Sequence, residues 1–389
     1  GVSEVAERLG VSRQAIYDWQ QRYRDDPESG LNDRSRRPHT SPSRTALAIE
    51  QRVIAERKRW EFGSKKILRR LQDEEPGVAW PPRSTVDAIL KRAGLVQSRK
   101  AVRRRFAPAA ARHTYEATAP GQVMTADYKG QFRLRNGRYC YPLLVADPVS
   151  RYLLACDAFT AISLEQTWSS FLRVFRQHGM PDMMHTDNGI PFGTSGHGRF
   201  STISVRLMKY GIRPVYSRPG HPEDNGRHER LNKTLMECTT IDPARNHAAQ
   251  QVVFDAFRRM HNDERPHESL GLDRPAHRHR QSPRSFPSRV PVLEYPSHFE
   301  TQLVDARGRM RWEGTRVHFS DAFANERIAF ERIDDSSWRV HYGSFEIGPT
   351  SPRSTGSSDR TVCRAQGLTL PRPCSVAAAR TLRMCQICP

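Results

Sequence analysis

The stretch Met183-Met184-His185-Thr186-Asp187-Asn188-Gly189 decides the fold, because it reads as a short strand that ends on a carboxylate. An earlier segment, Met124-Thr125-Ala126-Asp127-Tyr128, alternates as a strand does and also carries an acid. The residues between them predict a hairpin turn at Asn136-Gly137, strands at 141–146 and 151–158, and a helix at 163–178. In a mixed sheet with this order the first and fourth strands can lie side by side, which would bring Asp127 and Asp187 together.

A third acid, Glu229, lies in the segment 225–238, which predicts a helix. Glu229, Lys233 and Met236 share one face of it at helical spacing, so Lys233 can hold a DNA phosphate near the acid. The alternative is an ordinary surface pair of Glu and Lys. Three converging carboxylates suit hard divalent cations such as Mg²⁺, and paired ions of this kind support displacement at phosphorus.

The composition favours a polyanionic partner, since the formal net charge is +20 and the pI is about 10.2. Residues 1–112 carry 25 Lys and Arg against 14 Asp and Glu, whereas residues 113–270 carry 19 against 16. The basic excess therefore lies at the front. We find no apolar run long enough for a membrane span, and seven scattered cysteines fit a cytosolic protein without structural disulfides.

Residues 1–29 predict a helix-turn-helix. Gly10 ends a first helix whose apolar face holds Val5, Ala6 and Leu9, and Ser12 caps a second. The second helix has an expected buried face and an outward face that would enter a DNA groove. The buried face comprises Ala15, Ile16, Trp19 and Tyr23, and the outward face comprises Arg13, Gln14 and Tyr17. The alternative is a plain helical hairpin with a solvated face.

The remaining front segments alternate between linkers and a helical unit. Residues 30–43 predict a basic Pro-rich linker, and residues 44–98 predict a second, winged-type helical DNA-binding unit, with a helical spacer as the alternative. Residues 99–119 predict another basic linker, in which Arg103, Arg104 and Arg105 either track phosphates or are simply solvated.

Behind a core expected at residues 120–271, the chain predicts a linker at 272–297 and a small β-barrel at 298–348. The tail 349–389 has six Arg, one acid and no aromatic residue, so we expect disorder and suspect a translated frameshift. The front begins at Gly1 inside a helical pattern, which suggests truncation.

Several residues compete for roles in the core. Asp147 precedes a proline turn and is expected to be structural, and Asp157 is expected to face solvent. The polar segment 189–204 predicts a mobile loop. His261, Asn262, Arg265 and His267 either bind DNA or brace the sheet.

Four motifs in order resemble the retroviral-integrase-like DDE transposases of bacterial insertion sequences. The motifs are Ala126-Asp127, the stretch 185–189, the stretch 218–232 and the stretch 262–271. The resemblance covers about residues 1–348 and implies an RNase H-like fold, two Mg²⁺ ions with Mn²⁺ as a substitute, and the triad Asp127, Asp187 and Glu229. The 41 residues between Asp187 and Glu229 exceed the retroviral spacing.

The fold class expected is therefore multidomain: N-terminal all-α helix-turn-helix units, a central α/β RNase H-like mixed sheet, a C-terminal small β-barrel and a disordered tail. The expected activity is Mg²⁺-dependent 3′-end cleavage and strand transfer, on double-stranded DNA of element ends and target, by a homo-oligomer. His221 and Asn225 are further candidate DNA contacts. We expect a cytoplasmic, nucleoid-associated bacterial protein. The alternative is a catalytically idle DNA-binding regulator derived from a transposase.

Overall fold

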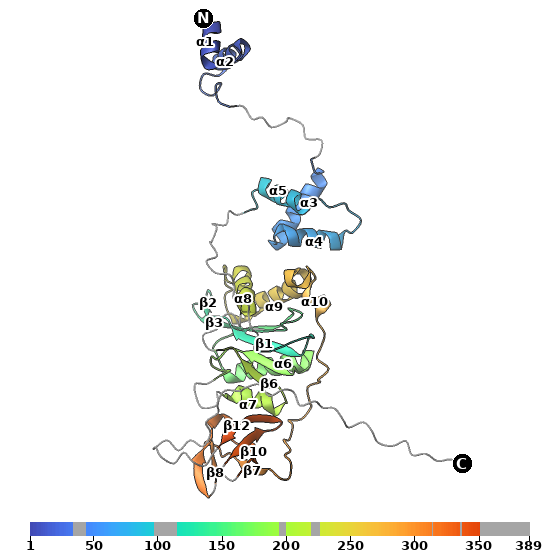
Figure 1. Cartoon of the computed structure of the whole chain (residues 1–389), viewed down its shortest axis with the longest axis vertical. Helices are drawn as coiled ribbons and strands as arrows, with labels where there is room; N and C mark the ends of the chain where they lie inside the picture. The colour runs from blue at the N-terminus through green and yellow to red at the C-terminus, as the bar shows by residue number, and fades with distance from the viewer. Residues whose placement is uncertain are drawn as a thin grey trace, which may run out of the picture. The chain divides into compact units, whose positions relative to one another are not determined.

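The computed structural model describes residues 1–33, 44–96, 115–193, 200–218, 226–312, 314–334 and 337–350 (Figure 1). The chain divides into two compact units. The first comprises residues 1–71 and 75–96, and the second comprises 72–74 and 97–389. We describe each unit by itself.

The first two helices form the expected helix-turn-helix layout. Helix α1 (Val2–Leu9) ends at Gly10, which has a left-handed φ of 64°. The Ser12 hydroxyl then accepts a hydrogen bond from the Ala15 amide and caps α2 (Arg13–Asp25). The expected buried face of α2 is partly wrong, because Trp19 and Tyr23 are 38% and 52% exposed. Two short helices enclose too little volume to bury such large rings.

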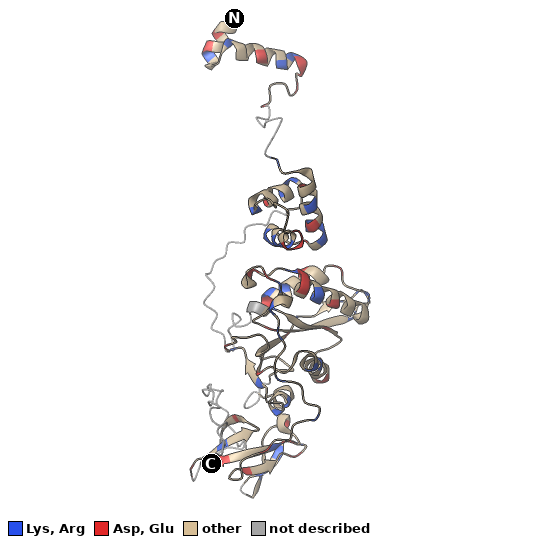
Figure 2. Cartoon of the chain, turned by 90° about the vertical axis from the view of Figure 1, so that its right-hand side faces the viewer, with Lys and Arg blue, Asp and Glu red and all other residues tan. Residues whose placement is uncertain are grey.

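Three further helices, α3 (Leu47–Trp60), α4 (Ser64–Glu74) and α5 (Arg83–Arg92), pack around a small apolar core. A fully buried ion pair joins α3 to α4, with Arg70 Nε 2.7 Å from a Glu56 carboxylate oxygen. Glu50 of α3 likewise holds Arg92 of α5 at 2.7 Å. Acidic and basic residues alternate along these helices (Figure 2). Charge pairing therefore reinforces a modest core in this part of the chain.

A mixed six-stranded sheet organises the second unit. Strand β3 (Tyr139–Ala146) pairs antiparallel with β4 (Leu153–Phe159) on one side and with β1 (Val123–Tyr128) on the other. The short β2 (Phe132–Arg133) pairs with the start of β3. Beyond β1 lie β5 (Met183–Thr186) and β6 (Arg213–Tyr216), both parallel to it. The predicted adjacency of the first and fourth long strands is confirmed.

Helices cover both faces of the sheet (Figure 1). On one face, α6 (Leu164–His178) and α7 (Thr202–Lys209) pack on a core that contains Phe171, Phe175 and Met184. On the other face, α8 (Gly226–Thr239) and α9 (His247–Arg259) pack on Leu144 and Phe254. The result is a three-layer α/β/α arrangement. Helix α7 lies in the segment predicted as a mobile loop, so that prediction is wrong for residues 202–204.

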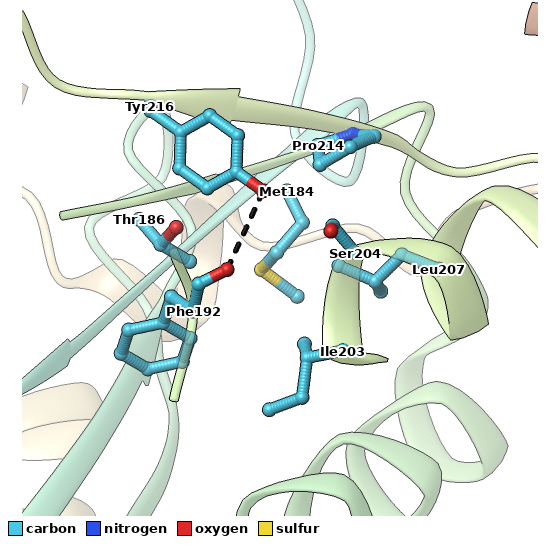
Figure 3. Close-up of a pocket in the computed structure, with 8 residues that line it drawn as sticks. All are labelled: Met184, Thr186, Phe192, Ile203, Ser204, Leu207, Pro214 and Tyr216. Atoms are coloured by element: carbon cyan, nitrogen blue, oxygen red, sulfur yellow. Dashed lines mark hydrogen bonds between the residues drawn. The ribbon is translucent and has the colours of Figure 1, made fainter. Parts of the chain in front are cut away.

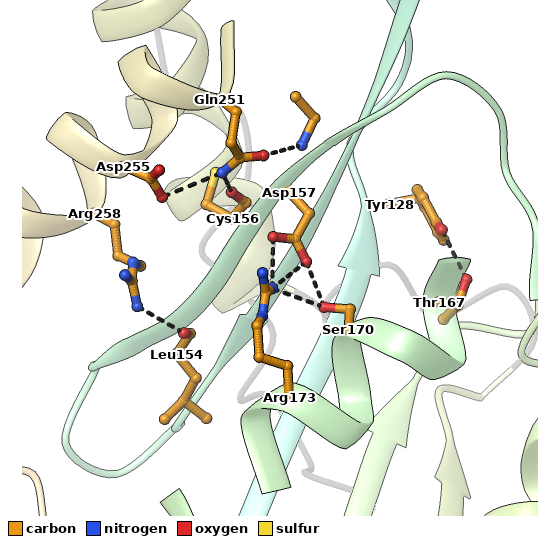
Figure 4. A network of polar contacts seen from close by, with 11 residues as sticks. Tyr128, Leu154, Cys156, Asp157, Thr167, Ser170, Arg173, Gln251, Asp255 and Arg258 are labelled. Atoms are coloured by element: carbon orange, nitrogen blue, oxygen red, sulfur yellow. Dashed lines mark hydrogen bonds and ion pairs between the residues drawn. The ribbon is translucent and has the colours of Figure 1, made fainter. Parts of the chain in front are cut away.

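Side chains from α9 cover the outer edge of β4 (Figure 4), and so does Asn262 of the following π-helix (Met260–Glu264). The Gln251 amide accepts from the Ala158 N–H and donates to the Cys156 carbonyl. Asn262 pairs in the same way with both backbone groups of Leu153, at 2.8 and 3.0 Å. The edge strand is thus satisfied by side chains instead of by another strand. Of the two roles left open for Asn262, bracing the sheet is the one observed.

The segment expected to be a linker is attached to the core. After a 3₁₀ turn (Glu268–Leu270) and α10 (Pro275–Arg278), residues 279–286 run along the start of β5. The Arg284 guanidinium donates to the carbonyls of Pro181, Tyr210 and Gly211. The Met180 amide donates to the Arg284 carbonyl at 2.7 Å. We call residues 279–286 the strap.

The C-terminal strands are β7 (Glu300–Leu303), β8 (Arg309–Trp312), β9 (Thr315–His318), β10 (Arg327–Arg332), β11 (Trp338–Tyr342) and β12 (Phe345–Thr350). The expected barrel is not confirmed, because the described strands form a four-stranded and a two-stranded sheet. Their core includes Phe200, Val205 and Met208, so these strands pack directly on α7. Lys209 and Glu326 add an ion pair at 2.7 Å.

The predicted disordered tail lies outside the described residues from 351 onward. No helix in the described ranges is long and apolar enough to cross a membrane. Cys140, Cys156 and Cys238 are free thiols.

Candidate functional site: an acidic edge of the central sheet

Asp127 and Asp187 lie next to each other at one edge of the sheet. In the parallel pairing of β1 with β5, Ala126 is opposite Thr186, so the two following residues occupy equivalent positions on adjacent strands. Strands in a sheet are about 4.8 Å apart, and residues at equivalent positions point to the same face. The two carboxylates therefore face the same side, although 59 residues separate them in the chain.

The electrostatics agree with this proximity. The pKa of Asp187 is raised, first by burial and second by the negative charge of Asp127, while the Gly189 amide opposes the shift. Asp127 is 7% exposed. Two acids that raise each other's cost of ionisation gain from a cation placed between them.

Helix α8 brings a third element to this edge. The Asn232 amide donates a 2.7 Å hydrogen bond to Asp127 Oδ2, and both side chains are buried. His228, Asn232 and Leu235 form the buried stripe of α8 at helical spacing. Glu229 is three residues before Asn232, so it lies one turn away along the helix, on the exposed border of this stripe.

The structure brings together two of the three predicted acids. Among the described residues, no three His, Cys, Asp or Glu side chains are arranged to hold a metal ion. Glu229 is exposed, while its helix contacts Asp127 through Asn232. Sequence reasoning missed Asn232. The usable signal was its position one turn after Glu229, which places it on the same side of the helix.

The candidate DNA contacts on described residues are all at the surface. Arg13, Gln14 and Tyr17 are exposed on the first turns of α2, where Gln14 also donates to Asp18. Lys233 is exposed on α8, and its Nζ lies 4.0 Å from Glu237 Oε1. The ion pair of Lys233 is therefore with Glu237 instead of Glu229. The remaining candidates, Arg103, Arg104, Arg105, His221 and Asn225, lie outside the described residues.

The competing acids have structural roles. Asp147 accepts hydrogen bonds from the amides of Gly121, Val149 and Ser150 and so builds the turn after β3. Asp157 was expected to face solvent, and that is wrong. It is 4% exposed, and it joins β4 to α6 through Ser170 and Arg173 (Figure 4). The alternation of β4 points it at α6, a contact invisible in the sequence.

A narrow cleft, too tight to hold a water molecule, lies between α7 and the sheet (Figure 3). Its lining includes Met184, Phe192, Ile203 and Leu207, and the Tyr216 hydroxyl donates to the Phe192 carbonyl across it. These residues belong to the core on the α6 and α7 face, whereas Asp127 faces α8. The cleft is therefore a packing gap that is separate from the acidic edge.

Comparisons with solved structures give retroviral integrases at low similarity. The integrase catalytic core domain of HTLV-2 in complex with magnesium is 17% identical with a TM-score of 0.31, over 42% of this chain and 99% of that one. The simian T-cell lymphotropic virus intasome with PP2A regulatory subunit B56 gamma is 15% identical with a TM-score of 0.36, over 80% and 99%. The core domain of BIV integrase is 14% identical with a TM-score of 0.31, over 40% and 92%.

Family models locate the domains along the chain. Two models described as integrase core domain match residues 117–222 and 210–275, and together they span both aspartates, Asn232 and Glu229. A model described as homeodomain-like matches residues 15–105. Residues 117–275 of this chain are therefore similar to integrase core domains, and residues 15–105 are similar to homeodomain-like domains.

Proposed function

We propose that this protein is a DDE-type DNA transposase that cleaves the 3′ ends of an insertion element and joins them to target DNA. The observation that carries the proposal is the side-by-side placement of Asp127 and Asp187 at an edge reached by helix α8. The match to integrase core domains supports the same chemistry. Glu229 completes the proposed triad from the first turn of α8.

Asp127 and Asp187 fit a divalent cation, because their mutual repulsion and their oxygen donors both favour one. Glu229 is the proposed third ligand, and it must turn inward from its exposed position. Two Mg²⁺ ions, replaceable by Mn²⁺, would supply Lewis-acid stabilisation of charge at phosphorus. The chain itself contributes orientation, because the Asn232 amide donates a hydrogen bond to Asp127 Oδ2 and so fixes the position of that carboxylate.

The partner is double-stranded DNA. The exposed face of α2, with Arg13, Gln14 and Tyr17, is proposed to read the element ends. The homeodomain-like match begins at residue 15, so of these three it includes Tyr17. Joining two ends in one event requires at least a dimer on DNA. We place the activity at the nucleoid in the bacterial cytoplasm.

One observation favours a second function. Glu229 is exposed and no three-ligand cluster is formed in the described ranges, which is what a catalytically idle DNA-binding regulator would show. The two functions differ in chemistry and agree in DNA binding. A cleavage assay therefore separates them.

The test uses purified full-length protein, Mg²⁺ or Mn²⁺, and duplex DNA from either side of the reading frame. The transposase is expected to release 3′-hydroxyl ends and join them to plasmid DNA. Asp187→Asn and Glu229→Gln should abolish both steps while DNA binding is kept. The matched controls are Asp263→Asn and Glu237→Gln, which change exposed acids and should retain activity. DNA binding without cleavage by the unaltered protein would establish the regulator instead.

A further inference from the structure

We infer that the β2–β3 hairpin, residues 129–139, is a second DNA-binding surface that holds the phosphate backbone beside the acidic edge. This inference rests on the proposed function, because it concerns DNA bound at the same edge.

The hairpin projects from the edge that carries the two aspartates. Asp127 is opposite Leu144 on β3, and the ladder continues from there to Arg133 opposite Tyr139. Leu144 and Tyr139 are five residue steps apart on β3, which is about 17 Å at ~3.4 Å per step. That distance equals about five base pairs of DNA at ~3.4 Å each. A duplex seated on the aspartates therefore reaches the hairpin within half a helical turn.

The charge of the hairpin is of one sign. Residues 129–139 contain Lys129, Arg133, Arg135 and Arg138 and no acid. The three arginines are exposed. Of the four cations, only Arg135 has an acidic partner within ion-pair distance among the described residues, namely Asp242. The other three cations, Lys129, Arg133 and Arg138, can contact phosphates with release of counterions.

The hairpin also presents an arginine packed against an aromatic ring. The Arg133 guanidinium lies over the ring of Tyr139 at 5.0 Å, and that ring is 39% exposed. Stacking holds the guanidinium in a fixed orientation, so less side-chain freedom is lost when it meets a phosphate. Arginine in this arrangement can contact two phosphate oxygens at once.

The hairpin is held in place by the loop between α8 and α9. The amides of Arg135 and Asn136 donate to the carbonyls of Ala244 and Arg245, at 3.1 and 3.2 Å. A His247 ring nitrogen lies 2.9 Å from the Tyr139 carbonyl. Because α8 carries Glu229, the same loop links the hairpin to the helix of the proposed triad. The cations are thus presented on a braced element.

The test compares Arg133→Gln/Arg138→Gln with a control of equal charge change, Arg176→Gln/Arg259→Gln. The control residues are exposed, and each lies in the last turn of its helix, Arg176 in α6 and Arg259 in α9. The readout is the affinity of the full chain for a 30-base-pair duplex of arbitrary sequence between 50 and 200 mM salt. Each lost phosphate contact lowers the salt slope by about 0.9, so two contacts make the fall in affinity over this range about twelvefold smaller.

A hairpin variant whose salt slope matches that of the control would overturn the inference. The proposed function fails separately, through absent cleavage by the unaltered protein. Where cleavage occurs, the hairpin variant should raise the KM for DNA and leave kcat unchanged, since its side chains do not touch the reacting phosphate. A fall in kcat with an unchanged KM would contradict the surface assigned here.

Discussion

Replacing Asn232 tests the link between helix α8 and the acidic edge. The Asn232→Leu change keeps the side-chain size and removes the amide that donates to Asp127 at 2.7 Å. Both groups are more than nine-tenths buried, so water replaces the donor poorly. A hydrogen bond to a charged group contributes about 1.5–3 kcal/mol, and we expect a loss of that order in the local stability of α8.

The assay is hydrogen exchange of the α8 and β1 amides in the full chain, because a multidomain protein lacks one unfolding free energy. The same change made in an Asp127→Asn background should cost much less, so the cycle should yield a coupling of about 1.5–3 kcal/mol. The Mg²⁺ concentration for half-maximal cleavage should also rise. A coupling below about 0.5 kcal/mol would refute the reasoning, because the pair would then be incidental.

Three other changes test the framework. Glu56→Gln should destabilise α3–α5 by about 3–5 kcal/mol, because buried Arg70 loses its closest carboxylate. The double variant Glu56→Leu/Arg70→Leu should recover most of this stability. Hydrogen exchange of the α3 and α4 amides measures both changes. Burial lowers the pKa of His178 to about 4 from 6.5, so the unfolded imidazole protonates first and stability falls as pH drops from about 6.5 towards 4. His178→Phe should flatten that dependence in thermal melts. Lys209→Ala removes the half-buried contact with Glu326 and should loosen α7 by about 1–2 kcal/mol, measurable by exchange at residues 202–209.

Local patterns predicted much of the core. The helix predicted at residues 163–178 is α6 (Leu164–His178), and the Ser163 hydroxyl caps it by accepting from the Gln166 amide. Gly137 takes the positive φ that the hairpin turn requires, at 80°. The adjacency of Asp127 and Asp187 followed from strand order and from the parity of side chains along parallel strands.

Local sequence patterns do not predict contacts between residues that are far apart in the chain. The spacing from Glu229 places Asn232 on the same side of α8, but its partner Asp127 lies 105 positions away, so the sequence does not reveal their hydrogen bond. Asp157 has ordinary strand surroundings in the chain, and its burial depends on Arg173 of α6. The role of Glu229 stays a prediction, because it depends on a side-chain position that differs from the one described.

Linkers were also misjudged, for a physical reason. The segment 272–297, which contains the strap, is basic and Pro-rich, and such a composition usually indicates solvated chain. Arg284 instead donates to three backbone carbonyls that the core leaves unpaired. The composition of a segment indicates whether water can solvate it, but it does not identify the backbone carbonyls that its side chains can hydrogen-bond.

The side-chain lining of β4 sets an order of events during synthesis. Gln251 and Asn262 are made about a hundred residues after the strand whose backbone they satisfy. A nascent chain therefore exposes a bare strand edge until α9 has left the ribosome, and bare edges recruit other chains. A polypeptide that ends before residue 251 would keep this strand edge bare and should aggregate more readily than the whole chain.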